Sequence, residues 1–105
     1  MLVLALLHQR EYHAPELTEG IAAHSGGAVN ISFPYAILYR MIEHGYIQET
    51  AKRIAPDGRR RQYFGITSDG REYFRQQKAI YQIFIAGVNR LLDAVYTEQN
   101  GVTET

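Results

Sequence analysis

The chain has 105 residues, which is enough for one domain with one modest core. Its 11 lysines and arginines balance its 11 aspartates and glutamates, so the net charge does not by itself indicate a nucleic-acid-binding protein. There is no cysteine, which excludes disulfides and thiolate metal sites.

The first third of the chain predicts two helices. Leu2 to Leu7 is a continuous apolar run, and its leucine and alanine content favours a helix. The run is too short to span a membrane and no small-residue cleavage site follows it, which favours a cytoplasmic protein. We expect a polar turn from Arg10 to His13. A second helix is expected to begin at Ala14-Pro15-Glu16, because proline and an acidic residue suit the first turn, and to end at Ser25-Gly26-Gly27.

The stretch from Ser32 to Ile47 predicts a third helix with two different faces. Ser32 stands at the N-cap position, Pro34 falls in the first turn, and Gly45 follows where a left-handed C-cap is favoured. The apolar face has the spacing of an amphipathic helix and consists of Phe33, Ile37, Leu38, Met41 and Ile42. The other face is expected to project from the domain and carries Tyr35, Tyr39, Arg40 and Glu43.

A β-hairpin is predicted next. Ile47 to Ile54 alternates poorly between apolar and polar residues, so its assignment as a strand depends mainly on the turn that follows. Proline and the Asp-Gly pair favour a tight turn at Ala55-Pro56-Asp57-Gly58. The segment from Arg59 to Ile66 contains the strand formers Tyr63 and Phe64.

The last segment predicts one long helix from Asp69 to about Thr97, roughly 40 Å in length. Its apolar residues form a seam that is typical of a coiled coil and consists of Tyr81, Phe84, Val88, Leu91 and Val95. A small core cannot cover this surface, so we expect a second copy of the chain to do so. The expected organisation is a DNA-binding domain at 1–68, a dimerisation helix at 69–98 and a disordered tail at 99–105.

Three helices followed by a hairpin is the order of a winged helix-turn-helix, so the expected fold is mostly α with a small β-hairpin and one long C-terminal helix. Between Lys52 and Arg61 there are five basic residues and one acidic residue, Asp57. A wing with this charge can bind DNA phosphates whatever the base sequence. The candidate DNA-binding residues are Asn30, Ser32, Tyr35, Tyr39, Arg40, Lys52, Arg59, Arg60 and Arg61.

Each of these groups also has a purely structural interpretation. The basic turn could be solvated without a function, Asn30 and Ser32 could be plain helix caps, and Tyr35 or Tyr39 could pack under the wing. The four histidines show no metal-ligand spacing, and no motif indicates an enzyme or a cofactor. The aromatics of the last helix favour a dimer core over a ligand site, although they could line a cavity between subunits.

The sequence resembles the PadR-like transcriptional regulators. His13 with Glu16-Leu17 is similar to the family's segment at the start of the second helix, and Tyr35 matches the characteristic tyrosine of its third helix. The third helix continues this match through Leu38, Arg40, Met41, Gly45 and Ile47. The wing supplies the most specific match, through Gly58, Arg60, Arg61, Tyr63, Phe64, Ile66, Thr67 and Gly70. The sequence departs from the family pattern at Ser32, Phe33, Pro34 and Gly65.

The resemblance implies a homodimeric DNA-binding repressor whose terminal helix contacts its twin. Some members of the family bind planar aromatic compounds between these helices, which implies a small aromatic effector. We therefore expect a transcriptional regulator that binds a pseudo-palindromic operator on double-stranded DNA. The alternative is a winged-helix protein–protein module without DNA binding, which net neutrality and Pro34 favour slightly.

Overall fold

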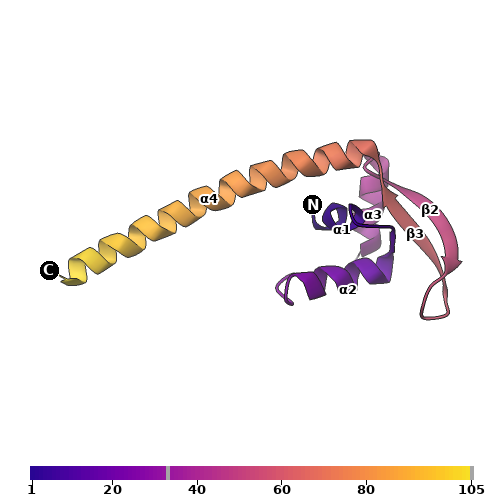
Figure 1. The fold of residues 1–105 in the computed structure, drawn as a ribbon, viewed down its shortest axis with the longest axis horizontal. Coiled ribbons are helices and arrows are strands. Elements are labelled where there is room, and N and C mark those ends of the chain that lie inside the picture. The colour runs from indigo at the N-terminus through magenta and orange to yellow at the C-terminus, as the bar shows by residue number, and fades with distance from the viewer. Residues whose placement is uncertain (33, 105) are drawn as a thin grey trace. The chain divides into compact units, whose positions relative to one another are not determined.

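The computed structural model describes residues 1–32 and 34–104, with side chains described through residue 95. They belong to two compact units, Met1–Arg75 and Gln76–Thr105, which we describe separately. Figure 1 shows the elements of both units. In the part of the chain that the structure describes, every helix is too short or too polar to cross a membrane.

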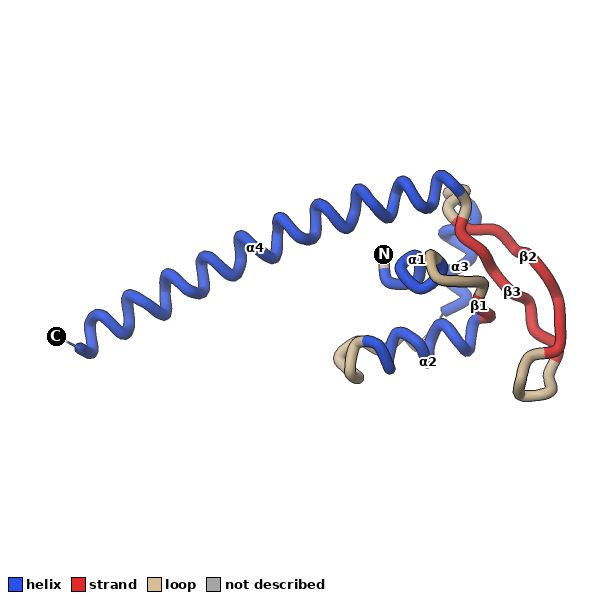
Figure 2. Tube along the Cα trace, in the orientation of Figure 1, coloured by secondary structure: helices blue, strands red, loops and turns tan. Residues whose placement is uncertain are grey.

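The first unit contains three helices, a small sheet and the beginning of a fourth helix. Its elements in chain order are α1 (Leu2–Leu7), β1 (Tyr12–His13), α2 (Ala14–His24), α3 (Pro34–Glu43), β2 (Ile47–Ile54), β3 (Arg60–Ile66) and the first turns of α4 (Ser68–Glu104). The predicted fold class is confirmed, because the chain is mostly helical and β2 and β3 form the expected hairpin (Figure 2).

The core of the first unit forms where the three short helices meet the sheet. Leu4, Leu17 and Leu38, one from each helix, are fully buried and belong to the same apolar cluster. Ile47 and Phe64 add the contribution of the two long strands. The predicted apolar face of α3 lines this core as expected, except that Phe33 lies outside the described residues.

The sheet has one strand more than we predicted. Tyr12 and His13, which we assigned to a polar turn, form β1 and pair antiparallel with Phe64 and Tyr63 of β3. The prediction was wrong because two buried residues are too short a segment to show a strand period. The strand order is β1-β3-β2. The ladder between β2 and β3 is irregular between Glu49 and Lys52, which explains the poor alternation of β2.

A reciprocal pair of hydrogen bonds fixes the start of α2. His13 is the N-cap, and its Nδ1 accepts a hydrogen bond from the backbone N–H of Glu16 at 3.4 Å. In return, the His13 backbone N–H donates to Glu16 Oε1 at 3.2 Å. Pro15 lies in the first turn as predicted, where its missing N–H would have no acceptor within the helix.

The end of α3 is joined directly to the start of α4. Gly45 has a φ of 76°, which confirms the predicted left-handed C-cap. Thr67 Oγ1 donates to the Gly45 carbonyl oxygen at 2.6 Å and accepts from the backbone N–H of Gly70 at 3.0 Å. The rings of Tyr46 and Tyr73 stack with their centroids 4.1 Å apart. These contacts fix the helical turn that carries Tyr73 to the turn that follows α3.

The second unit consists of the remainder of α4. The helix ends at Glu104, and the division into a dimerisation helix and a tail stays a prediction. Gly101 makes a helix less favourable by about 1 kcal/mol but does not forbid it. The predicted seam is exposed to solvent in the single chain, with Phe84 64% and Leu91 65% exposed, while Val88 is partly buried.

Candidate nucleic-acid interface

The outer face of α3 presents two aromatic side chains together. Tyr35 and Tyr39 are 50% and 55% exposed, and their rings stack with centroids 6.4 Å apart and planes 30° apart. They stand four residues apart, so both lie on one side of the helix. Arg40 is also exposed and lies in the last turn. Neither tyrosine belongs to the buried core, so the outward face that we predicted for α3 exists.

The loop before α3 holds the two polar candidates. Asn30 is exposed, and its Nδ2 donates a hydrogen bond to the Gly27 carbonyl oxygen at 3.2 Å. Ser32 is exposed as well and lies two residues before the first residue of α3. The amide nitrogen of Asn30 therefore already forms a hydrogen bond within the loop.

Asp57 organises the turn at the end of the wing. Its Oδ1 accepts from the backbone N–H of Arg59 at 3.0 Å, and its Oδ2 accepts from Arg61 Nη2 at 2.8 Å. The side chain of Arg61 lowers the pKa of Asp57, and the same hydrogen bond raises the pKa of Arg61. Gly58 supplies the positive φ of 82° that the turn requires.

The three consecutive arginines of the wing consequently differ in how readily they can bind an external group. Arg59 and Arg60 are exposed, whereas only 23% of the Arg61 side chain is exposed and it is paired with Asp57. Lys52 pairs across the hairpin with Gln62 and is also exposed. Lys52, Arg59 and Arg60 are therefore the cationic groups of the wing that are best placed to meet an external phosphate.

A second internal ion pair involves Arg53, which lies opposite Arg61 in the hairpin. Arg53 Nη1 donates to Glu11 Oε2 at 3.0 Å, and its guanidinium carbon lies 3.7 Å from the centroid of the Tyr63 ring. This pair connects β2 to the segment before β1, which are 42 residues apart in the sequence. Sequence reasoning missed it, because nothing in the local pattern around Glu11 predicts a partner that far away.

The raised pKa of Arg61 is due first to its hydrogen bond with Asp57, and Tyr35 makes a smaller contribution. The outer face of α3 thus carries exposed aromatic side chains, and the hairpin carries exposed cations. Among the residues that the structure describes, no group of three His, Cys, Asp or Glu side chains could hold a metal ion.

A three-helix core with a hairpin of this kind defines a winged helix-turn-helix protein. Residues 3–76 match the family described as "Transcriptional regulator PadR-like family". The chain therefore belongs to the PadR-like family, as its sequence resemblance indicated. Its members are transcriptional regulators and not enzymes, and regulation of transcription implies binding to DNA. A comparison with curated proteins gives no match.

Solved structures of regulators share the fold over most of the chain. A PadR-like transcriptional regulator from Bacillus cereus is 28% identical, with a TM-score of 0.72 and 86% coverage of both chains. A transcriptional regulator from Clostridium thermocellum is 22% identical, with a TM-score of 0.74 and coverage of 85% of this chain and 84% of that chain. A PadR family regulator from Clostridium difficile is 18% identical, with a TM-score of 0.72 and coverage of 87% and 94%.

Proposed function

We propose that the protein is a homodimeric repressor that binds a pseudo-palindromic operator through α3 and the wing. The observation that carries this proposal is that the Tyr35–Tyr39 pair on α3 and the cations of the hairpin are all exposed in one winged helix-turn-helix unit. Arginine and lysine bind phosphates irrespective of sequence, whereas a helix in the major groove reads base edges. The wing would thus supply most of the affinity for DNA, and α3 would supply the sequence specificity.

The roles of the individual residues follow from their exposure. Tyr35 and Arg40 are the groups that we propose to reach bases or nearby phosphates, with Tyr39 supporting the Tyr35 ring through stacking. Asn30 and Ser32 are proposed to contact a phosphate near the N-terminus of α3. Lys52, Arg59 and Arg60 are proposed to bind the backbone, and Arg61 joins them when it leaves Asp57.

Dimerisation is proposed to occur through α4. Tyr81, Phe84, Leu91 and Val95 are exposed in the single chain and repeat at the spacing of a helix–helix interface. An exposed apolar stripe of this length is unfavourable in water, and a second copy of the same helix offers a matching surface. Two-fold symmetry then predicts two operator half-sites about 34 Å, or a multiple of this distance, apart.

A small aromatic compound is proposed as the effector that releases the dimer from DNA. Tyr81 and Phe84 supply exposed ring faces on the proposed interface, where a planar compound could stack between subunits. Binding there would change the population of dimer geometries only if the compound prefers one of them.

The test combines selection of bound fragments from a random DNA pool with a salt titration of the selected site. We expect a two-fold-symmetric consensus, and a repeated selection with candidate aromatic compounds should recover less DNA. Replacing Arg59 and Arg60 together by alanine should reduce the salt slope by about 0.9 per lost phosphate contact. Recovery of random fragments only, with an unchanged salt slope in the double variant, would contradict the proposal.

A protein–protein module without DNA binding is the second candidate. It is favoured by the internal neutralisation of Arg53 by Glu11 and of Arg61 by Asp57, which leaves fewer external cations on the wing. Binding to random duplex at low salt separates the two functions, since a DNA-binding protein retains a non-specific affinity there.

A further inference from the structure

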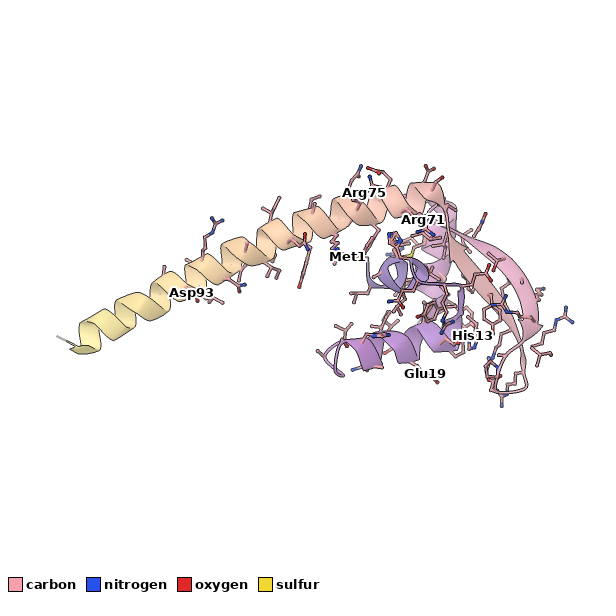
Figure 3. All side chains as sticks on the ribbon, viewed as in Figure 1. Met1, His13, Glu19, Arg71, Arg75 and Asp93 are labelled. Atoms are coloured by element: carbon pink, nitrogen blue, oxygen red, sulfur yellow. The ribbon has the colours of Figure 1, made fainter. Side chains whose placement is uncertain are left out.

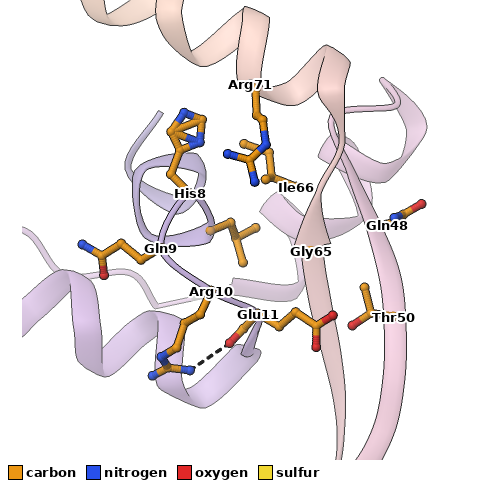
Figure 4. A pocket seen from close by; sticks show the side chains of 10 residues that line it. His8, Gln9, Arg10, Glu11, Gln48, Thr50, Gly65, Ile66 and Arg71 are labelled. Carbon is orange, nitrogen blue, oxygen red and sulfur yellow. Dashed lines mark hydrogen bonds between the residues drawn. The ribbon is translucent and has the colours of Figure 1, made fainter.

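A pocket of about 260 Å³ lies on the first unit, away from the residues that we propose for DNA binding or dimerisation. The end of α1, the segment before β1, the strands β2 and β3 and the first turns of α4 surround it (Figure 4). Sites for drug-sized ligands measure about 300–1,000 Å³, so the volume suits a smaller molecule.

Gly65 creates the space on the side of the sheet. It is buried in β3 and its φ is not positive, so the backbone does not require glycine there. A Cβ atom at this position would lie 3.0 Å from Thr50 Cγ2 and 3.9 Å from Glu11 Cγ. A larger side chain would therefore occupy part of the pocket, which is open because residue 65 has none.

The charges that line the pocket do not cancel. Arg10 is bound by the Glu16 carboxylate at 3.3 Å and the Glu11 carbonyl oxygen at 2.8 Å, and the Glu11 carboxylate is paired with Arg53. Arg71, in contrast, is exposed and forms no ion pair with any residue that the structure describes. Its guanidinium group leaves the pocket with one uncompensated positive charge.

The rest of the lining favours an organic ligand over an inorganic one. Leu7 and Ile66 supply apolar wall, while Gln48 and Thr50 supply hydrogen-bonding groups from β2. The one uncompensated charge, that of Arg71, balances a singly charged anion and would leave a doubly charged one with an excess negative charge. A guanidinium group matches the geometry of a carboxylate and can bind both of its oxygens.

We propose that this pocket binds a small organic monocarboxylate. Arg71 pairs with the carboxylate group, the polar side chains of β2 complete its hydrogen bonds, and the short apolar body lies against Leu7 and Ile66. The inference is independent of DNA binding, because none of these residues belongs to the proposed DNA-binding surface.

The test uses the full-length protein labelled with ¹⁵N and three probes that differ in charge. Butyrate is the probe of the proposed class, n-butylammonium has a similar body with the opposite charge, and inorganic phosphate is an anion without an apolar part. Butyrate should shift the amide resonances of Thr50, Gly65 and Arg71 in a saturable manner, and the other two probes should not. Equal shifts with phosphate or butylammonium would overturn the proposal.

Two substitutions of the same helix make the test specific. Arg71→Gln should weaken butyrate binding by about tenfold or more, as expected for the loss of a charged hydrogen-bond partner. Arg75→Gln is the matched control, because Arg75 lies one turn further along α4, pairs with Glu72 at 2.9 Å and does not line the pocket (Figure 3). An equal loss in both variants, or no loss in Arg71→Gln, would contradict the assignment.

Thr50→Phe supplies a second test that leaves Arg71 in place. Thr50 is exposed on β2, and its side chain lies next to the space left open at Gly65. An aromatic residue is compatible with a strand. The larger ring should fill the pocket and abolish the butyrate-induced shifts. Persistence of these shifts in Thr50→Phe would place the ligand elsewhere and would overturn the proposal.

Discussion

The backbone carbonyl oxygen of Tyr46 occupies the space in which a side chain at Gly70 would begin. A Cβ atom built on Gly70 would overlap this oxygen, far inside any permitted contact. The glycine is thus required by the close approach of α4 to the turn after α3, which Thr67 holds through its two hydrogen bonds.

Gly70→Ala should destabilise the protein by about 3 kcal/mol, because the methyl group forces the two backbone segments apart. Gly87→Ala is the control on the same helix, since a Cβ atom there meets nothing within 4 Å. It should be neutral or should stabilise α4 by up to about 1 kcal/mol. Thermal unfolding followed by circular dichroism measures both effects, and equal midpoints for the two variants would contradict the packing argument.

Asp57→Asn should increase the dependence of DNA binding on salt. The amide oxygen can still accept from the Arg59 backbone N–H, but the ion pair that holds Arg61 is lost. One additional phosphate contact by Arg61 would steepen the salt slope by about 0.9. Glu49→Gln removes the same charge from an exposed position on β2, and an equal change in this variant would show that only net charge matters.

Tyr35→Ala should weaken operator binding without unfolding the protein. The side chain is half exposed and is absent from the buried core, so we expect a stability change within about 0.5 kcal/mol. Fluorescence anisotropy with labelled operator measures the affinity, and size-exclusion chromatography checks that the mass is unchanged. A large drop in unfolding temperature would instead assign Tyr35 a structural role.

Phe84→Glu and Leu91→Glu should each convert the proposed dimer to a monomer. Both side chains are more than half exposed in the single chain, so a charge there costs little until a second helix covers it. The mass measured by light scattering after size exclusion should halve. Retention of the wild-type mass by both variants would show that this seam is not the interface.

Acid should destabilise the first unit partly through Glu16. Burial by itself raises the pKa of Glu16, but hydrogen bonds from the His13 backbone N–H and Arg10 outweigh it, and the pKa falls below its ordinary value of 4.5. The ionised carboxylate therefore stabilises the folded state above this value, and the contribution is lost as the pH falls through the lowered pKa. Glu16→Gln should flatten the decline of the unfolding temperature below about pH 4.5. An unchanged pH profile would contradict this assignment.

The sequence predicted the elements whose signals are local. Pro15, Gly45 and the Asp57-Gly58 turn act through backbone geometry, so the helix boundaries and the hairpin could be read directly. The amphipathic spacing of α3 likewise identified its inner and outer faces.

The features that sequence reasoning missed depend on the geometry of the folded chain. β1 is only two residues long and exists because β3 pairs with it. The Arg53–Glu11 pair depends on the folded sheet, and the pairing of Arg61 with Asp57 depends on the shape of one turn. Sequence alone could identify a basic wing, but it could not tell which of its arginines are already neutralised within the chain.

The strand order β1-β3-β2 also has a consequence for the behaviour of the protein in concentrated solution. β2 is an edge strand with one free side, and such an edge can recruit a strand from another molecule. Its irregular pairing near Glu49 and its charged residues Lys52 and Arg53 work against this, as does the short length of β1 at the opposite edge. These features disfavour association through the sheet edge, which fits the proposal that self-association uses the exposed apolar side of the last helix.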